Sequence, residues 1–384
     1  MLNFVFHNPT KIIFGKGTIS QLAEEIAPDK KVLMTFGGGS IKSNGVYDQV
    51  KKALCGYTLF EFGGIEPNPR YETLMKAVAV CKDRNIDFLL AVGGGSVLDG
   101  TKFIAAAVDF KGADPWDILE KHAPVESAIP IGSVLTLAAT GSESNGFAVI
   151  SRESTKEKLA FASQYTFPKF SILDPQTTIS LPRRQTINGI VDAFVHVCEQ
   201  YVTFDVDTPL QARQAESILL TLMEIAHNVL DQPDNYDARA NLMWCATQAL
   251  NGLIGCGVAH DWSTHMIGHE LTALYGIDHA QSLACVMPAV WRHQKNNKGC
   301  RLIQYANRVL GISSGSDGEI IEQAISKTVD FFHSLNMPTR LSDYGIASDR
   351  FDEIASRVIG HKGKLGEHAV IGEQEVVDIL NLAL

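Results

Sequence analysis

The sequence lacks the cysteine pattern of a disulfide-stapled protein or of a cysteine-bound zinc site. Its seven cysteines are odd in number and scattered, and none stands in a Cys-x-x-Cys pair. The N-terminal segment Met1–Phe14 also lacks a basic region followed by a long apolar run and a small-residue cleavage site. No apolar stretch approaches the roughly 18 uninterrupted residues that a membrane-spanning helix needs. We therefore expect a cytoplasmic protein with reduced cysteines that crosses no membrane.

An excess of positive charge is missing as well. The 33 Lys and Arg residues are outnumbered by 43 Asp and Glu residues, which gives a formal net charge of −10. A surface of this sign disfavours a nucleic-acid backbone and an anionic membrane as partners. A nucleotide cofactor is compatible with it, because backbone N–H groups at a helix N-terminus bind phosphate locally. Hydrophobic residues make up 45% and charged residues 20% of the chain, as in ordinary globular enzymes.

The first half of the chain alternates short apolar runs with helical patterns. The expected strands are Lys31–Phe36, Phe88–Val92, Ile129–Thr136 and Phe170–Leu173. The segment Tyr71–Arg84 has helical spacing, with Leu74, Val78 and Cys81 on one face. Strands that alternate with helices predict an α/β domain with a mostly parallel sheet covered on both faces.

Helical periodicity dominates the second half. The segment Asp174–Pro182 carries two prolines and several polar residues, which is typical of a connection between domains. Beyond it, Gln211–Leu230 has apolar residues at helical spacing, and Asp237–Leu253 is rich in Ala, Leu and Met. Because 384 residues exceed one typical core, we expect an α/β domain at residues 1–180 and an all-α domain at residues 181–384.

Potential metal ligands recur at a spacing of four residues in the second half. Asp192 and His196 lie on one face of a helix, and Glu199 extends that face by another turn. His265 and His269 form a second pair of this spacing. A single such pair is usually a surface or core hydrogen bond, whereas two together favour a shared metal site. Imidazole and carboxylate groups suit Zn²⁺ or Fe²⁺ without any thiolate.

Two further histidines flank the second pair. His279 follows His269 by ten residues, and His260 precedes the pair. The spacing alone does not decide which three or four groups bind the metal. His269, like His260, can lie beside the metal without binding it.

A glycine-rich turn, Gly93–Ser96, follows one expected strand and precedes a helical pattern at Val97–Val108. Its glycines allow the backbone to approach a pyrophosphate, and Ser96 can cap the helix, whose dipole favours the anion. Asp99 lies in the first turn of this helix, where the plainer role of a carboxylate is to stabilise the helix dipole. The turn is not the G-x-G-x-x-G fingerprint, so it is a weak signal alone.

A second turn, Gly37–Ser40, follows the strand at Lys31–Phe36. NAD-specific enzymes place an acidic side chain after such a strand to hold the ribose 2′-OH, and none is present here. Ser40, the bare N–H groups and Lys42 would instead accept the additional phosphate of NADP. If this site binds a dinucleotide, the sequence favours NADPH.

These segments together resemble the iron-containing (group III) alcohol dehydrogenases, in particular their butanol-dehydrogenase-like branch. The matching segments are GGGSVLDGTK at Gly93–Lys102, TLAATGSES at Thr136–Ser144, VDAFVHVCEQ at Val191–Gln200 and the histidines His265, His269 and His279. The similarity runs from Lys11–Gly17 to Leu341–Ile346. It implies a Rossmann-like N-terminal domain plus an all-α C-terminal domain, the architecture of dehydroquinate synthase.

The resemblance also implies roles for particular residues. The implied metal ligands are Asp192, His196, His265 and His279. His269 would lie near the nicotinamide as the candidate proton relay. The implied NADP(H) contacts are Gly38, Gly39, Ser40, Gly94, Gly95, Ser96, Asp99, Thr136, Thr140, Asn145 and Lys158. Taken by itself, Lys158 is typical of an ordinary surface lysine.

Two departures from the family pattern stand out. Many members have Pro-His-Gly where this chain has Asp278-His279-Ala280. Asp is common at the position of Gly39 or Ser40 in members that use NAD, and its absence again points to NADPH.

The resemblance implies a metal-dependent NADPH alcohol dehydrogenase that works mainly as a reductase of short-to-medium-chain aldehydes. Zn²⁺ and Fe²⁺ both fit the ligands, and a homodimer is the expected assembly. One alternative is a lyase related to dehydroquinate synthase, which would need a basic pocket that the apolar Phe147, Phe161 and Trp262 do not suggest. The other is a metal- or nucleotide-binding protein without turnover, which the complete ligand set argues against.

Overall fold

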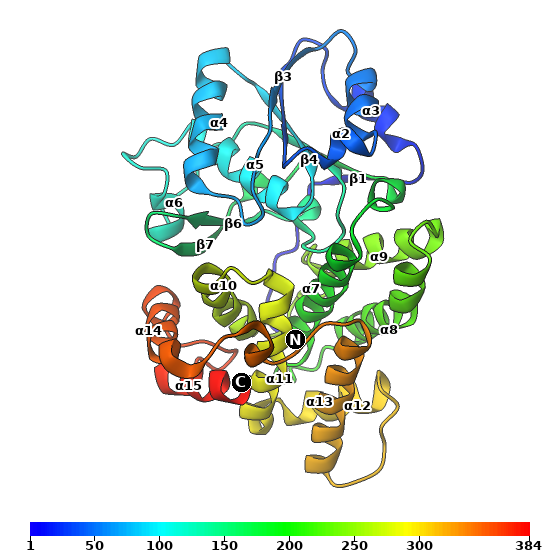
Figure 1. Ribbon diagram of the computed structural model, residues 1–384, viewed down its shortest axis with the longest axis vertical. Helices are drawn as coiled ribbons and strands as arrows, with labels where there is room; N and C mark the ends of the chain where they lie inside the picture. The colour runs from blue at the N-terminus through cyan, green and yellow to red at the C-terminus, as the bar shows by residue number, and fades with distance from the viewer. The chain divides into compact units, whose positions relative to one another are not determined.

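The computed structural model describes all 384 residues, which form two compact units (Figure 1). The sheet unit comprises His7–Pro182 and Gln232–Thr247, and the helical unit comprises Met1–Phe6, Arg183–Asp231 and Gln248–Leu384. The N-terminal six residues therefore belong to the helical unit, and most of helix α9 (Tyr236–Ala249) belongs to the sheet unit.

A six-stranded, wholly parallel sheet forms the centre of the sheet unit. Its strands are β1 (Lys11–Phe14), β2 (Lys31–Phe36), β3 (Thr58–Phe62), β4 (Phe88–Gly93), β5 (Ile131–Leu135) and β8 (Phe170–Leu173). They lie in the order β3-β2-β4-β5-β8-β1. The chain runs from β2 outward to β3 and then returns to β4 on the other side of β2. The carboxyl ends of β2 and β4 therefore flank a topological switch point, where open α/β sheets bind their ligands.

Helices cover both faces of this sheet. On one face, Met34 and Phe36 of β2 share a buried cluster with Val46 and Val50 of α3 (Val46–Ala53). On the other, the hydroxyl of Thr35 lies 2.6 Å from that of Thr101. Because successive strand residues point to opposite faces, this alternation fixes which helices lie where. The expected α/β class is confirmed.

The remaining elements of the sheet unit are short, apart from two helices that pack together. These are α4 (Tyr71–Arg84) and α5 (Gly95–Val108). The short helices are η1 (Thr18–Gln21), α1 (Leu22–Glu25), α2 (Ser40–Ser43), α6 (Asp117–Glu120), η2 (Ser142–Ser144), η3 (Gln164–Thr166) and η4 (Pro175–Thr178). An antiparallel hairpin, β6 (Phe147–Arg152) and β7 (Glu157–Ala162), packs against α5 and α6.

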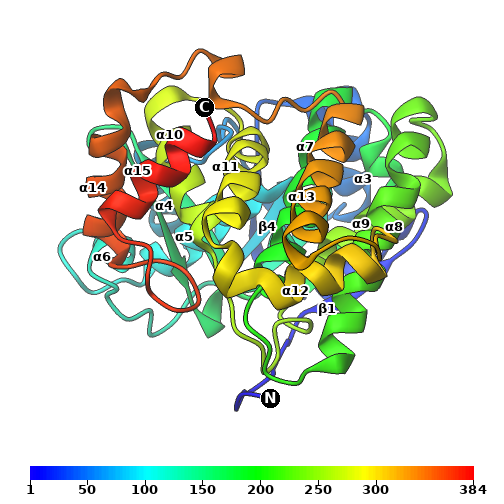
Figure 2. The ribbon, with the colours of Figure 1, turned by 90° about the horizontal axis from the view of Figure 1, so that it is seen from below.

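The helical unit contains eight α-helices and no strand. They are α7 (Arg183–Tyr201), α8 (Pro209–Asp231), α10 (Ser263–Tyr275), α11 (His279–His293), α12 (Lys295–Arg308), α13 (Asp317–Ser334), α14 (Phe351–Lys362) and α15 (Glu373–Leu382), with the short η5 (Leu341–Tyr344) and η6 (Ser348–Arg350). Helix α11 packs against α7, α10, α13 and α15, and Figure 2 shows it between α10 and α13. Val286 and Val290 of α11 are fully buried in this core.

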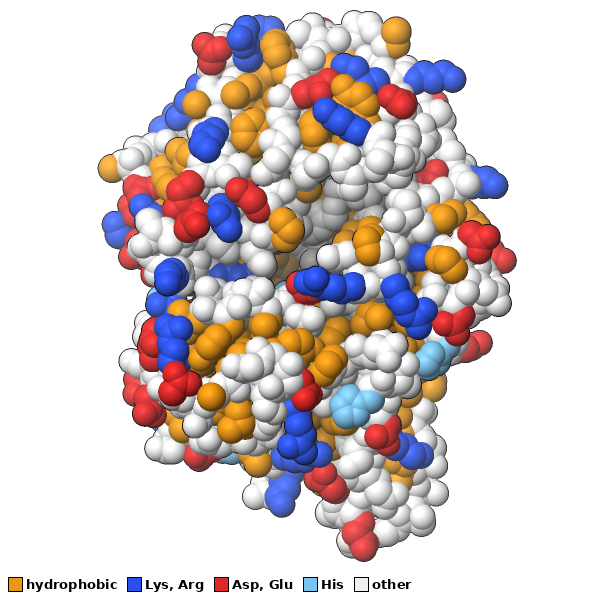
Figure 3. Space-filling model, in the orientation of Figure 1, with side chains coloured by type: hydrophobic (Ala, Val, Ile, Leu, Met, Phe, Trp, Pro, Cys, Tyr) orange, Lys and Arg blue, Asp and Glu red, His pale blue; other side chains and the backbone are white.

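Helix α7 is enclosed along most of its length, because every residue from Gly189 to Tyr201 is buried. Polar groups on such a helix must find partners inside the protein. None of the helices combines the length and apolarity needed to cross a bilayer. The face in Figure 3 mixes acidic and basic side chains rather than presenting one broad basic area.

Candidate functional site

Three helices of the helical unit bring carboxylate and imidazole groups together around one oxygen atom. Asp192 and His196 come from α7, His265 from α10 and His279 from the first turn of α11. Each imidazole places its Nε2 close to Asp192 Oδ1. The distances are 3.7 Å for His196, 3.8 Å for His279 and 3.9 Å for His265.

This arrangement fits a bound divalent cation. With metal–ligand bonds of about 2.0–2.1 Å, neighbouring ligand atoms of a tetrahedral site lie about 3.4 Å apart. The observed separations are slightly wider and too long for hydrogen bonds. Asp192 Oδ1 is buried and has no hydrogen-bond partner. A buried carboxylate oxygen in this state is costly, and a cation would stabilise it.

The ligand atoms of Asp192, His265 and His279 lie within 4.8 Å of one another. His196 is outside this mutual set, although its Nε2 is the imidazole nitrogen nearest to Asp192 Oδ1. Its ring stacks on that of His265, with centroids 4.6 Å apart. Burial lowers the pKa of His196 to about 4. The imidazole is therefore neutral at pH 7, which is the form that binds a metal ion.

Glu199 fixes the orientation of one imidazole. Its Oε2 accepts a hydrogen bond from His265 Nδ1, and its Oε1 accepts one from the backbone N–H of Thr264 at 2.7 Å. With the proton held at Nδ1, the Nε2 lone pair of His265 faces Asp192 and is available to a metal ion.

His269 and His260 lie outside the group around Asp192. The ring of His269 is 5.1 Å from that of His279 and 6.3 Å from that of His265. His260 is bonded locally, since its Nε2 lies 2.9 Å from Gly255 O and its Nδ1 accepts from Trp262 Nε1 at 3.2 Å. The structure thus brings together the four residues that the resemblance implied and leaves His269 beside them.

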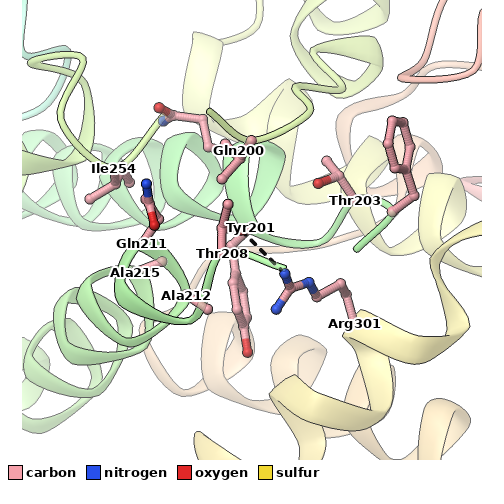
Figure 4. A pocket seen from close by; sticks show the side chains of 11 residues that line it. Gln200, Tyr201, Thr203, Thr208, Gln211, Ala212, Ala215, Ile254 and Arg301 are labelled. Atoms are coloured by element: carbon pink, nitrogen blue, oxygen red, sulfur yellow. Dashed lines mark hydrogen bonds between the residues drawn. The ribbon is translucent and has the colours of Figure 1, made fainter. Parts of the chain in front are cut away.

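A separate small cavity lies at the carboxyl end of α7 (Figure 4). Its walls include Tyr201, Thr208, Gln211 and Arg301, and its volume of about 10 Å³ suits a single water molecule. It is too small for an aldehyde.

The second group of candidate residues lies in the sheet unit at the switch point. The turn Gly37–Ser40 follows β2 and the turn Gly93–Ser96 follows β4, so both stand at the carboxyl ends of neighbouring strands. The loop that begins at Thr136 follows β5, the next strand, and Thr136 N donates to Gly93 O at 3.0 Å. All three predicted cofactor segments therefore share one edge of the sheet.

Gly94 and Gly95 are required by the protein's own packing. A Cβ at Gly94 would lie 2.9 Å from Leu137 Cβ, and one at Gly95 would lie 2.5 Å from Thr140 Oγ1. At Gly38 and Gly39 an added Cβ would meet no atom within 4 Å. Gly39 has a φ of 102°, which favours glycine. These turns are glycine-rich for different reasons.

Ser96 does not cap α5. The N-cap residue of α5 is Gly94, and Ser96 Oγ instead accepts a hydrogen bond from Asn68 N at 3.3 Å. Lys158, which by itself is typical of a surface lysine, has a buried side chain that donates to Asn68 Oδ1 at 2.9 Å. Asn68 thus links two candidate cofactor residues. The sequence pattern gave no signal for it.

Asp99 and Asn145 belong to a buried network built around Lys102. Lys102 Nζ donates to Ser142 Oγ at 2.8 Å, to Asn145 Oδ1 at 3.0 Å and to Phe147 O at 2.7 Å. Ser142 Oγ in turn donates to Asp99 Oδ1 at 2.6 Å. Burial lowers the pKa of Lys102 to about 8 and raises that of Asp99. Lys102 and Ser142 were not predicted, although a lysine among the apolar residues of α5 was a signal.

Lys42 lies close to the turn after β2. Its Nζ is 5.1 Å from the ring centroids of both Phe36 and Tyr47. The two aromatic faces hold this cation near the turn.

Comparison with known proteins agrees with these features. A family model described as "Iron-containing alcohol dehydrogenase" matches residues 9–175, and one described as "Fe-containing alcohol dehydrogenase family, C-terminal" matches residues 186–384. The chain is 56% identical over 371 residues to the NADPH-dependent aldehyde reductase YqhD of Escherichia coli, covering 96% of both proteins. It is 45% identical over 389 residues to the probable NADH-dependent butanol dehydrogenase 1 of Bacillus subtilis, covering 100% of both.

Comparison with a solved structure indicates the same family. The crystal structure of Escherichia coli YqhD matches with a TM-score of 0.99 at 54% identity, over 100% of this chain and 99% of that one. The resemblance drawn from the sequence is confirmed. The chain belongs to the iron-containing alcohol dehydrogenase family.

Proposed function

We propose that this protein is a metal-dependent NADPH alcohol dehydrogenase that works mainly as a reductase of short-to-medium-chain aldehydes. The observation that carries the proposal is the convergence of three imidazole Nε2 atoms on Asp192 Oδ1, at 3.7–3.9 Å. YqhD is named an NADPH-dependent aldehyde reductase, and its 56% identity to this chain supports the same reaction here.

Asp192, His196, His265 and His279 are the proposed ligands of one Zn²⁺ or Fe²⁺ ion. When bound, the cation acts as a Lewis acid that polarises the carbonyl of the substrate. Three neutral imidazoles and one carboxylate leave a single positive charge on the site, which favours the alkoxide that forms during reduction. Both metals suit this ligand set, so availability in the cell decides between them.

His269 is the proposed proton relay. It adjoins His279, with ring centroids 5.1 Å apart, and belongs to the same helix as His265. An imidazole nitrogen of His269 would deliver the proton to the alkoxide, and water is the competing route.

NADPH is the proposed hydride donor, held by the edge of the sheet unit where the three cofactor segments meet. The proposed contacts are Gly38, Gly39, Ser40, Gly94, Gly95, Ser96, Asp99, Thr136, Thr140, Asn145 and Lys158. The names of the relatives divide between NADPH and NADH, so the preference rests on this chain's own turn. Gly37–Ser40 has no carboxylate to repel a 2′-phosphate, and Lys42 lies nearby.

The proposal also covers organisation. Residues 1–180 would form the NADP-binding domain and residues 181–384 the metal-binding domain, in a cytoplasmic homodimer. Small apolar pockets discriminate chain length weakly, so we expect several short and medium aldehydes to be reduced.

The test is the loss of reduced-nicotinamide absorbance with butanal, comparing NADPH with NADH before and after chelation and restoration of Zn²⁺ or Fe²⁺. We expect NADPH consumption that chelation abolishes and metal restores. The variant His265→Ala should lose bound metal and activity together while keeping its far-UV circular dichroism. Full activity in that variant, or no consumption with either metal, would overturn the proposal.

A further inference from the structure

One face of α7 carries a row of polar residues that leads to the candidate metal centre. Its residues, spaced four, four, four and three apart, are Arg184, Asn188, Asp192, His196 and Glu199. This spacing aligns them along the helix. The last three residues of the row provide two proposed ligands and the carboxylate that orients His265. The first two, Arg184 and Asn188, donate hydrogen bonds to Asp278, the residue before His279.

His279 is the most exposed of the four proposed ligands. Its side chain is 24% exposed, against 5–6% for Asp192, His196 and His265. The other ligands lie inside the turns of α7 and α10, whereas His279 is the first residue of α11. Its position therefore depends on how the start of α11 is held.

Asp278 holds that start. It is the N-cap residue of α11 and forms a capping box with Gln281, whose Oε1 accepts from Asp278 N at 2.9 Å. Its side chain also reaches α7. Arg184 donates from Nη2 to Asp278 Oδ1 at 2.5 Å and from Nε to Oδ2 at 2.6 Å. Asn188 Nδ2 donates to the same Oδ2 at 2.7 Å.

We propose that Arg184 and Asn188 are positioning residues that set His279 in place for the metal through the carboxylate of Asp278. The inference rests on the proposed function, because it concerns the same metal centre. A bidentate guanidinium–carboxylate pair fixes direction as well as distance. This pair joins Asp278, the residue before His279, to α7. The same helix carries Asp192 one turn after Asn188.

The exposure of Arg184 separates this role from ordinary stabilisation. The Arg184 side chain is 65% exposed, and exposed ion pairs contribute little to folding free energy. Loss of the pair should therefore leave the fold intact and act mainly on metal affinity. Groups that orient metal ligands typically change affinity by roughly 10–100-fold when removed.

The test compares the dissociation constants of Zn²⁺ in the full-length metal-free protein, measured by competition with a chromophoric chelator. We expect Arg184→Gln and Asp278→Asn each to raise the dissociation constant about tenfold or more. Asn still caps a helix, so Asp278→Asn keeps the start of α11. Arg184→Lys should recover part of the loss, because it restores the charge without the fork.

Arg183→Gln is the matched control. Arg183 precedes Arg184 on α7, is 46% exposed and bonds to Leu230 O and Asp231 instead. This control should bind Zn²⁺ as the unaltered protein does. The double variant Arg184→Gln with Asp278→Asn should lose no more affinity than the stronger single variant, because both act through one contact.

Two outcomes are distinguishable. Equal Zn²⁺ affinities for Arg184→Gln, Arg183→Gln and the unaltered protein would overturn the positioning role and leave the proposed function standing. Absence of specific Zn²⁺ or Fe²⁺ binding by the unaltered protein would remove both. Co²⁺ gives a second readout, because its visible absorption band reports ligand geometry and should change in Arg184→Gln but not in Arg183→Gln.

Discussion

Replacing Glu199 with Gln removes one acceptor oxygen from beside the metal centre and leaves the side-chain shape almost unchanged. The carboxylate accepts hydrogen bonds at both oxygens, from Thr264 N and from His265 Nδ1. An amide offers one acceptor and one donor, so only one of these bonds survives.

The two amide orientations have different consequences. If the amide oxygen faces Thr264, the NH₂ group faces His265 Nδ1 and forces its proton to Nε2, the atom that points at Asp192. If the oxygen faces His265, the NH₂ group opposes the buried N–H of Thr264. The metal-free variant can adopt the first arrangement, whereas the metal-bound variant is forced into the second.

The cost of metal binding in the variant is therefore the cost of an unpaired buried donor. That cost is about 1–3 kcal/mol, which corresponds to a roughly 5- to 150-fold rise in the metal dissociation constant. The assay is chelator competition with Zn²⁺, with circular dichroism to show that the variant is folded.

Glu216→Gln is the control for the loss of a buried carboxylate. Glu216 of α8 is buried and accepts hydrogen bonds from Tyr201 and Gln304, away from the proposed ligands. It should lower the free energy of unfolding without changing Zn²⁺ affinity. If Glu199→Gln bound Zn²⁺ as tightly as the unaltered protein, the argument that Glu199 fixes the tautomer of His265 would be refuted.

Three further changes test the sheet unit. Ser40→Asp should shift the NADPH-to-NADH ratio of kcat/KM toward NADH by about tenfold (~1.4 kcal/mol), because the carboxylate repels a 2′-phosphate; steady-state kinetics with an unchanged ratio would contradict this. Gly95→Ala should lower the free energy of unfolding by about 1–3 kcal/mol, since its Cβ would lie 2.5 Å from Thr140 Oγ1, whereas Gly38→Ala should not; equal urea midpoints would argue against the packing account. Burial lowers the pKa of Lys102 from 10.5 to about 8, so between these pH values the unfolded chain binds more protons at this site and the folded state gains stability as pH rises. That gain in the free energy of unfolding is about 3 kcal/mol between these pH values, and Lys102→Met should remove it. If urea unfolding gave the same pH slope for both proteins, the lowered pKa of Lys102 would be contradicted.

Segments with a clear apolar pattern could be predicted from the sequence almost residue by residue. The strands Lys31–Phe36 and Phe170–Leu173 and the helix Tyr71–Arg84 have the expected bounds. The two strands are nearly continuous apolar runs because both faces of the sheet are covered, and the helix has apolar residues at helical spacing on one face. The edge strands Lys11–Phe14 and Thr58–Phe62 were not predicted, since they are short and only partly buried.

The candidate site was less predictable, because it depends on contacts between distant segments. Spacing identified His265 and His269 as a pair, yet only the packing of the helices in the folded chain brings His265 Nε2 to 3.9 Å from Asp192 Oδ1. Lys158 resembles a surface lysine in sequence because its partner, Asn68, lies 90 residues away. No local pattern encodes such a contact.

The central claim is that one divalent ion binds between α7, α10 and α11. The most direct measurement is anomalous X-ray scattering from crystals of the protein loaded with Zn²⁺, recorded on both sides of the zinc absorption edge. The account predicts one strong peak per chain within bonding distance of Asp192 Oδ1 and of the Nε2 atoms of His196, His265 and His279. A peak elsewhere, or none at this position at full zinc loading, would contradict it.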